Sequence, residues 1–145
     1  MVKSSEPLIG YQLKYAQSLL NRRMDDVLRP LGLTVPQYSC LYQLGSNPGI
    51  SAAGLARVTF VSRQSTNALL QGLLDRGLVA RPEHAEAGRA LPVALTVSGQ
   101  EILAQANDVV DGVQERMLSG LSPDELASFA SALAACATAL EDKRK

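Results

Sequence analysis

Helix-start signals at three points constrain the fold of this chain more than any other feature of its sequence. Each is a Ser or Thr followed three positions later by Glu or Gln: Thr34 and Gln37, Ser98 and Glu101, and Ser122 and Glu125. In such a capping box the hydroxyl accepts a hydrogen bond from the backbone amide at the third helical position. The Glu or Gln side chain accepts one from the amide of the cap residue. The sequence therefore predicts a helix just after each of these three hydroxyl residues.

Apolar residues at helical spacing predict a helix before the first capping box. Its apolar face ends where Pro30 and Gly32 stop the helix and consists of Ile9, Leu13, Ala16, Leu20, Met24, Val27 and Leu31. The second helix is expected over about 35–44, with a stop at 45–49. Together these patterns predict two helices separated by a short turn.

Two further helices are expected before the middle of the chain. Ser51 can cap a short third helix that reaches Val58, and Ser62 can cap a fourth. The fourth helix is expected to end at Gly77, where the pattern is typical of a Schellman motif.

The apolar period changes from helical to alternating after Gly77. Every second residue of one segment is apolar, which predicts a half-buried strand containing Leu91, Val93, Leu95 and Val97. Residues 78–81 fit a partner strand, and the polar, turn-rich segment 82–89 would then be the loop of a hairpin.

The last two helices carry apolar stripes that have no evident cover within a small domain. One stripe consists of Ile102, Ala106, Val109, Val113 and Met117, and the other of Leu126, Phe129, Leu133, Ala137 and Leu140. A homodimer in which these helices and the first helix interleave across a two-fold axis would bury both stripes. The alternative is that the helices fold back on their own chain.

Composition excludes several classes of protein. A chain of 145 residues that is 46% hydrophobic predicts a single domain with a substantial core. No apolar stretch approaches the roughly 18 residues of a membrane span, and the N-terminus lacks a signal-peptide core, so we expect a cytoplasmic protein with no membrane contact. Cys40, Cys136 and one histidine supply neither a zinc cluster nor a disulfide framework. We expect no cofactor, and two buried, inert thiols.

Residues 51–76 have the layout of a helix-turn-helix, with a tight turn at 59–61 between two helices. The outer face of the second helix carries hydrogen-bonding side chains and no acid before Asp75. Such side chains suit base edges and phosphates, and the helix N-terminus adds backbone amides. The predicted DNA-binding residues are Ser51, Ser62, Arg63, Gln64, Ser65, Asn67, Gln71 and, in the hairpin, Arg89. The alternative is an ordinary solvated helix face.

The hairpin after this motif would serve as a wing. Arg89 lies near its expected tip, from which it would reach a narrow minor groove. The alternative for Arg89 is an ion pair within the loop, with Glu83 or Glu86 as the partner.

Several runs of residues resemble the MarR family of winged-helix transcriptional regulators over nearly the whole chain. They are Leu31-Gly32-Leu33-Thr34 with Pro36-Gln37-Tyr38, then Leu55-Ala56, then 73–81, and 89–96 with Gly99. The resemblance implies a mainly α fold of the α+β winged-helix class. Residues 1–33 would be an N-terminal dimerisation helix, 34–97 the winged helix-turn-helix lobe, and 98–145 the C-terminal dimerisation helices.

The same resemblance implies a homodimer on a pseudo-palindromic DNA duplex, with its recognition helices in successive major grooves and its wings in the minor grooves. Binding of a ligand, or oxidation, would weaken the complex with DNA. The wing pattern Asp-x-Arg is reduced here to Ala87-Gly88-Arg89, so another group must orient the arginine. Lys14 stands where peroxide-sensing members have a cysteine, so organic-peroxide sensing there is not expected.

The resemblance further implies a cleft between the DNA-binding lobe and the dimer helices that takes a small aromatic carboxylate or a phenolic effector. Four of the six aromatic residues fall in the first two helices, and Lys or Arg suits a carboxylate. The expected cleft residues are Tyr11, Lys14, Tyr15, Arg22 or Arg23, Tyr38 and Tyr42. The alternative is that the tyrosines are core residues whose hydroxyls reach water.

The expected function is a sequence-specific regulator of transcription, in most cases a repressor, that binds double-stranded DNA. The alternative is a helical dimer of the same fold that binds a small molecule or a protein but not DNA. An enzyme is not expected, because no phosphate loop, nucleophile elbow or carboxylate pair is present and His84 lies in the predicted hairpin loop.

The formal net charge of zero conceals segments of opposite sign. Residues 1–33 and 34–97 each carry five basic and three acidic side chains, whereas 98–145 carry four basic and eight acidic ones. The segment expected to contact DNA is therefore mildly basic. Its modest charge predicts that affinity depends on a dimer matching two half-sites.

Overall fold

The computed structural model describes residues 6–81 and 93–141 as a mainly helical chain with one small sheet. The elements are α1 (Glu6–Leu28), the short 3-10 helix η1 (Arg29–Leu31), α2 (Val35–Ser46), α3 (Ala52–Thr59), α4 (Arg63–Asp75), β1 (Val79–Ala80), β2 (Ala94–Leu95), α5 (Val97–Leu118) and α6 (Pro123–Leu140). The strands pair antiparallel, with Val79 opposite Leu95 and Ala80 opposite Ala94. The predicted fold class is confirmed.

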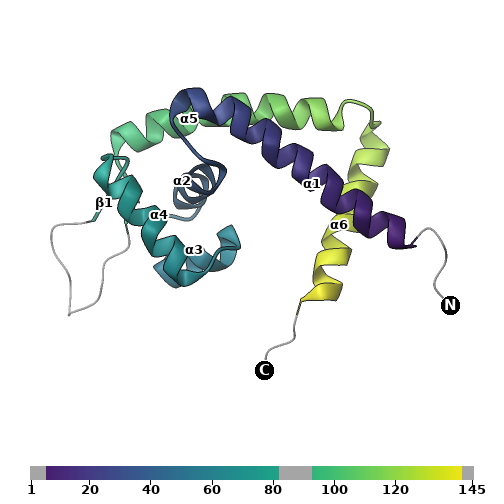
Figure 1. Ribbon diagram of the computed structural model, residues 1–145, viewed down its shortest axis with the longest axis horizontal. Helices are drawn as coiled ribbons and strands as arrows, with labels where there is room; N and C mark the ends of the chain where they lie inside the picture. The colour runs from purple at the N-terminus through teal and green to yellow at the C-terminus, as the bar shows by residue number, and fades with distance from the viewer. Residues whose placement is uncertain (1–5, 82–92, 142–145) are drawn as a thin grey trace.

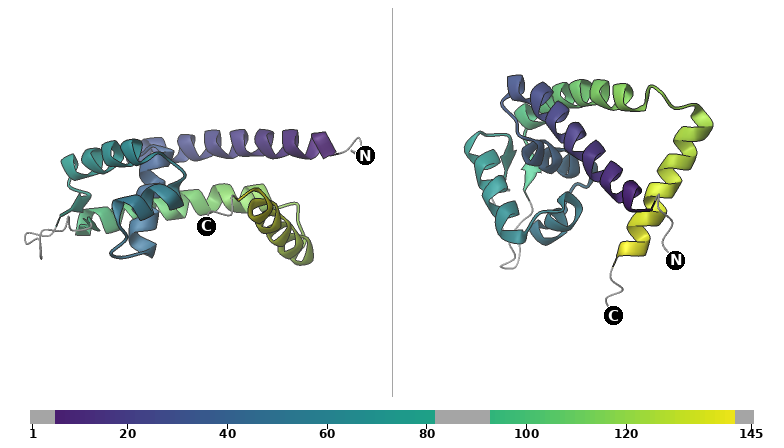
Figure 2. Two further views of the ribbon diagram at one scale, coloured as in Figure 1. Left: turned by 90° about the horizontal axis from the view of Figure 1, so that it is seen from below. Right: turned by 45° about the vertical axis from the view of Figure 1, so that its right-hand side comes forward.

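Two long helices extend from a lobe built by the shorter elements. Helices α2, α3 and α4 gather with the sheet at one end of the molecule. Helices α1 and α5 pack on each other, extend away from this lobe and diverge toward their far ends (Figure 1). Helix α6 turns away from the end of α5, and the view from below in Figure 2 shows α1 and α6 well separated. The fold therefore has a packed lobe and an extended helical part.

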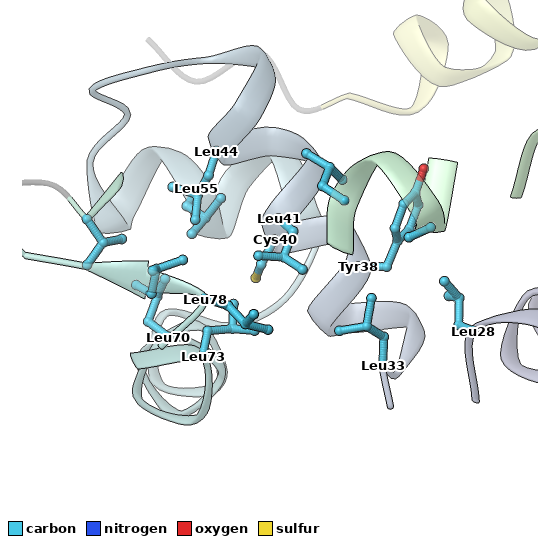
Figure 3. Packing of buried hydrophobic residues seen from close by; sticks show 14 of the residues in the cluster. Leu28, Leu33, Tyr38, Cys40, Leu41, Leu44, Leu55, Leu70, Leu73 and Leu78 are labelled. Carbon is cyan, nitrogen blue, oxygen red and sulfur yellow. The ribbon is translucent and has the colours of Figure 1, made fainter. Parts of the chain in front are cut away.

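The core lies where the lobe meets the C-terminal part of α1 and the first half of α5. Its most deeply buried side chains include Val79 and four leucines that Figure 3 labels: Leu28, Leu41, Leu55 and Leu73. Every helix except α6 contributes to this cluster or packs against it. Burial of these four leucines and one valine, which come from four helices and a strand, holds the short helices at fixed angles.

Local signals at most helix ends act as the sequence predicts. The capping boxes of Thr34 and Ser122 are both formed, and the Ser51 and Ser62 hydroxyls cap α3 and α4. Helix α4 ends in a Schellman motif at Gly77, which has a φ of 71°. Its two characteristic hydrogen bonds run from the Gly77 amide to the Leu74 carbonyl and from the Leu78 amide to the Leu73 carbonyl.

The predicted capping box of Ser98 and Glu101 is wrong. Helix α5 begins at Val97, and its cap is Thr96, whose hydroxyl accepts a hydrogen bond from the Gly99 amide. The same hydroxyl donates to the Gly77 carbonyl at 2.7 Å, so the link to the end of α4 selects the earlier cap. Val97 is 71% exposed at the first helical position and does not continue the buried face of a strand.

Smaller differences concern the ends of helices and strands. Helix α1 stops at Leu28, and Pro30 lies in η1, whose C-terminal cap is Gly32 with a φ of 72°. Helix α2 continues through Gly45 to Ser46. The strands are shorter than predicted, and Leu91 together with the expected hairpin loop 82–89 lies outside the described residues.

The extended part of the molecule leaves apolar side chains in contact with solvent. No residue of α6 is buried, and its exposed apolar side chains include Leu126, Phe129, Leu133 and Leu140. Leu8, Ile9, Tyr11, Leu13 and Tyr15 are likewise exposed on α1. Among residues 6–81 and 93–141, no helix combines the length and the apolar content that crossing a membrane requires.

The two cysteines have different environments. Cys40 is fully buried in the core, and burial raises the pKa of its thiol to about 11. Cys136 lies on α6 and is exposed, so the expectation of two buried thiols is wrong for this residue. The difference follows from the position of α6 outside the core.

Replacing Gly99 with alanine is expected to destabilise the fold by about 1–3 kcal/mol, because the new methyl group would collide with the Leu78 carbonyl oxygen of the adjacent backbone. Gly112→Ala is the matched control on the same helix, since no atom lies within 4 Å of its added carbon. There the change should be neutral or stabilise by up to about 1 kcal/mol. Urea unfolding measures the change in the free energy of unfolding for both variants. Equal changes would contradict the close approach of Gly99 to the Leu78 carbonyl oxygen.

Cys40 is expected to resist thiol reagents in the folded protein. In a Cys136→Ser variant, Ellman's reagent at pH 8 should react slowly, because a buried thiol with a pKa of about 11 forms almost no thiolate. Unfolding in urea should make the reaction fast. A Cys40→Ser variant reports Cys136 alone, and rapid labelling of Cys40 in the folded chain would show that the core opens there.

Candidate nucleic-acid interface and ligand cavities

Serine hydroxyls position the two helices of the helix-turn-helix. The Ser51 hydroxyl accepts a hydrogen bond from the Gly54 amide at 3.0 Å, which starts α3. The Ser62 hydroxyl accepts one from the Ser65 amide at 3.0 Å and donates to the Ser65 hydroxyl, which starts α4. Both serines are exposed, so the N-termini of α3 and α4 lie at the surface of the molecule.

The turn between these helices contains a residue that the sequence reasoning missed. Phe60 ends α3 in the left-handed region, with a φ of 60°, and its side chain is 93% exposed. A side chain other than glycine rarely adopts this conformation. In the sequence, an aromatic residue at a turn position where glycine is usual could have indicated this unusual backbone conformation.

The inner face of α4 packs into the lobe. Leu70 and Leu73 are buried, whereas Leu69 and Leu74 are partly buried against the same cluster. Thr66 is fully buried, and its hydroxyl donates to the Ser62 carbonyl at 2.9 Å. These contacts fix which side of α4 faces solvent.

The outer face of α4 presents the predicted polar side chains. Arg63, Gln64, Ser65, Asn67 and Gln71 are all exposed. Gln71 donates to the Asp75 carboxylate at 2.9 Å, so its amide is partly engaged. Arg63 has no carboxylate within ion-pair distance among the described side chains. At 100° per residue, four of these five residues share one face, and only Ser65 stands beside it.

The predicted wing residue is not placed. Arg89 lies outside the described residues, and so does His84. The pairing of β1 with β2 shows only that the strands on either side of this segment lie together.

A cavity with a volume of about 570 Å³ lies between α1, α2 and α5, and we call it the α1–α2–α5 cavity. Leu20 and Met24 line it from α1. Helix α2 contributes Ser39, Gln43 and the two predicted tyrosines, Tyr38 and Tyr42, and α5 contributes Asn107, Val110, Asp111, Gln114 and Met117. The lining is half apolar and half polar, with one carboxylate.

Tyr38 joins the lobe to α5 at this cavity. Its hydroxyl donates to the Asn107 side-chain oxygen at 2.8 Å, and Figure 3 shows it pointing toward the α5 ribbon. Burial raises the pKa of Tyr38 above its ordinary value, and the nearby Asp111 carboxylate raises it further. The ring of Tyr42 lies 6.1 Å from that of Tyr38, at an angle of 43°.

A second cavity, of about 440 Å³, lies between α1 and α5 alone, and we call it the α1–α5 cavity. Its lining is mostly apolar, with Leu19, Val27 and Val113 among the residues. Two arginines, Arg23 and Arg116, line it as well, and neither has a carboxylate within ion-pair distance among the described side chains. The third charged lining residue, Asp26, pairs with Arg29 at 3.8 Å.

The structure does not bring the six predicted effector residues together. Tyr11, Lys14, Tyr15 and Arg22 are exposed on α1 and lie outside the lining of both cavities, with Tyr11 and Tyr15 stacked on each other. The sequence reasoning missed the residues that α5 contributes. Their spacing was the available signal, since Asn107, Asp111 and Gln114 recur every three to four positions.

Among the described residues, no group of three or more His, Cys, Asp or Glu side chains could hold a metal ion.

Comparison with known proteins gives consistent matches along the chain. A family model described as the MarR family matches residues 31–90. The HTH-type transcriptional repressor Rv2887 of Mycobacterium tuberculosis is 38% identical over 121 residues, which cover 83% of this chain and 87% of the relative.

Solved structures match over a similar length. Rv2887 in complex with DNA superposes with a TM-score of 0.72 at 35% identity, covering 88% of this chain and 95% of that one. Its complex with salicylic acid gives a TM-score of 0.72 at 37% identity, covering 88% of this chain and 94% of that one. A MarR-family regulator from Silicibacter pomeroyi, at 21% identity, shares the fold with a TM-score of 0.81 and covers 94% of this chain and 92% of its own.

The extent of these matches, together with the helix-turn-helix and the two-stranded sheet that follows it, shows that this chain belongs to the MarR family.

Proposed function

We propose that this protein is a homodimeric transcriptional regulator that binds a pseudo-palindromic DNA duplex and is released by a small aromatic effector. The observation that carries this proposal is the outer face of α4, which is exposed, polar and free of acidic side chains from Arg63 to Gln71. A solvated helix face usually mixes Glu with Lys. The relative Rv2887, whose structure in complex with DNA superposes on this chain, supports the proposal.

Side chains near the start of α4 would read the DNA sequence. Gln64 and Asn67 lie on the exposed face and can each form paired hydrogen bonds with adenine in the major groove. Arg63, at the first helical position, reaches either a guanine or a phosphate. Ser65 and Gln71 lie at the edges of this surface and support backbone contacts.

The helix N-termini and the wing would hold the phosphates. Ser51 and Ser62 cap α3 and α4, and both serines are exposed, so the two helix N-termini lie at the surface. Such termini attract anions. Arg89 would supply the minor-groove contact from the wing.

The extended helices would form the dimer. Helix α6 has no buried residue, and five exposed apolar side chains lie on the first part of α1. A second copy related by a two-fold axis can cover both surfaces and place two α4 helices on successive half-sites. In this arrangement residues 1–33 and 98–145 form the dimerisation region and 34–97 form the DNA-binding lobe.

The α1–α5 cavity would bind the effector. Its apolar walls suit an aromatic ring. The guanidinium groups of Arg23 and Arg116, which have no ion-pair partner among the described side chains, suit a carboxylate. The complex of Rv2887 with salicylic acid supports an effector of this class. The effector first expected in a cleft with Tyr38, Tyr42, Tyr11 and Lys14 is thus assigned to the neighbouring α1–α5 cavity, which shares Leu20 and Met117 with the α1–α2–α5 cavity.

Substitutions on α4 and in the expected wing should separate base recognition from binding that does not depend on sequence. Gln64→Ala or Asn67→Ala should lose about 1–3 kcal/mol of discrimination at one base pair of a selected duplex. Arg89→Ala should instead weaken binding to all duplexes and lower the slope of log affinity against log salt by about one. Fluorescence anisotropy with duplexes selected from a random pool measures both effects.

The control is Gln17→Ala, which removes an exposed amide from α1 at a distance from the helix-turn-helix and should leave binding unchanged. A duplex with one half-site scrambled should bind far more weakly if the protein acts as a dimer. Wild-type binding by both the Gln64 and Asn67 variants would contradict the assignment of this face. Absence of DNA binding by the unaltered chain would favour a dimer that binds a small molecule or a protein.

Salicylate should raise the melting temperature of the protein and release it from DNA. Arg116→Gln should weaken salicylate binding about tenfold, as expected for the loss of one charge-assisted hydrogen bond. Arg22→Gln is the control, because Arg22 is an exposed arginine that lies outside the cavity lining. No thermal shift and no release across a panel of aromatic acids would exclude this effector class.

A further inference from the structure

The turn between α3 and α4 exposes an aromatic ring in a backbone conformation that disfavours it. Phe60 is 93% exposed, and with a φ of 60° it is the only residue other than glycine that has a positive φ in the described part of the chain. A β-carbon is crowded in this left-handed conformation, and an exposed aromatic ring is costly in water. A glycine at position 60 would avoid both costs, so packing within the chain does not account for the ring.

The residues around Phe60 hold the turn in place. Thr59 and Val61, on either side of it, are half-buried. The Thr59 hydroxyl donates to the Leu55 carbonyl at 2.7 Å, and two residues after Phe60 the Ser62 hydroxyl caps α4. The backbone of the turn is therefore supported on both sides, and a partner of the ring would not have to order it first.

The ring lies beside the surface of α4 that we propose to contact DNA. Phe60 precedes the helix cap Ser62 by two residues, so their α-carbons are no more than about 7.6 Å apart. Gln64, on the proposed base-reading face, lies two residues beyond Ser62, at the end of α4 that is remote from β1 (Figure 1). The ring thus extends the proposed DNA-binding surface beyond the helix itself.

The charges around the turn favour a polyanion as the partner of the ring. Arg57 and Arg63 lie three residues before and three residues after Phe60, and both are exposed. Neither has a carboxylate within ion-pair distance among the described side chains. No Asp or Glu occurs from Ser51 to Leu74. An apolar ring between two arginines matches the edge of a DNA groove, where the methyl groups of bases lie near phosphates.

We propose that Phe60 is a specificity-determining residue that packs on the 5-methyl group of a thymine in the major groove. This methyl group is the apolar feature of the base edges there, and apolar side chains including Phe recognise it. The inference rests on the function proposed above, to which it adds a base that the polar side chains of α4 do not read. The same contact would remove from water the ring that the free protein leaves exposed.

Deoxyuridine tests this contact directly, because it differs from thymidine only by the missing methyl group. Duplexes selected by the wild-type protein from a random pool should be enriched in thymine at one position of each half-site. That position should be adjacent to a base pair at which Gln64→Ala changes the preference. Replacing this thymine with deoxyuridine should weaken binding about fourfold for each half-site, as for one methyl group withdrawn from an apolar contact.

Variants at position 60 should remove the response to the methyl group. Phe60→Gly and Phe60→Asn both suit a left-handed turn, so they should keep or raise the melting temperature of the protein. Each should bind the thymine duplex more weakly than the wild type does, and each should bind the thymine and deoxyuridine duplexes equally. The double-mutant cycle formed by the protein and DNA changes separates this contact from a general change in affinity.

The matched control is Val97→Ala, which removes exposed apolar surface outside the helix-turn-helix. Val97 is 71% exposed at the first position of α5. This variant should respond to deoxyuridine as the wild type does. Fluorescence anisotropy measures the affinities, and sedimentation velocity shows whether each variant keeps the oligomeric state of the wild type.

A wild-type protein that binds the thymine and deoxyuridine duplexes equally would overturn the inference and leave the proposed function in place. A Phe60→Gly variant that binds both duplexes more weakly but still responds to the methyl group would overturn it too, because the ring would then contact only the sugar–phosphate backbone. Loss of the dimer in the Phe60 variants would assign the ring to a protein interface instead. Absence of DNA binding by the wild type would overturn both the proposed function and this inference.

Discussion

The close contact between the start of α5 and the two residues that precede β1, Gly77 and Leu78, is the constraint on which the arrangement of the two parts of the molecule depends. The Thr96 hydroxyl donates to the Gly77 carbonyl, and the Thr96 amide donates to the Leu78 carbonyl. Gly99 lets the helix approach that same carbonyl without a side chain between them. These bonds fix the direction in which α5 leaves the lobe. Helix α5 then supplies the surface on which α1 packs and one wall of each cavity.

The lobe presents α4 in one orientation because its inner face is anchored at several points. Thr66 is buried under the helix, Leu70 and Leu73 enter the core, and the Schellman motif at Gly77 ends the helix. The polar face of α4 and the N-terminal end of this helix consequently face solvent. In the proposed dimer this orientation, rather than net charge, determines how the two α4 helices meet the DNA.

The helical signals of the sequence predicted most of the elements because caps and apolar periods act locally. The boxes of Thr34 and Ser122 and the caps of Ser51 and Ser62 depend only on residues within one turn. The box of Ser98 failed because Thr96 competes for the same helix start, and its extra hydrogen bond to Gly77 comes from a residue 19 positions away. The exposure of Cys136 was missed because the apolar pattern of α6 predicts a buried face, whereas no residue of this helix is buried against the described part of the chain.

The sequence by itself determined the helix-turn-helix, the polar face of α4 and the family. The helices and the polar face follow from caps and from the period of the apolar residues, and the family follows from runs of contiguous residues. Only the tertiary structure decided which side chains surround the cavities. Tyr38 and Asp111 are far apart along the chain and face one cavity, whereas Tyr11 and Lys14, on the same helix as Leu20, lie outside it. The physical reason is that a cavity wall is set by how helices pack, and periodicity fixes the face of a helix but not the neighbour it meets.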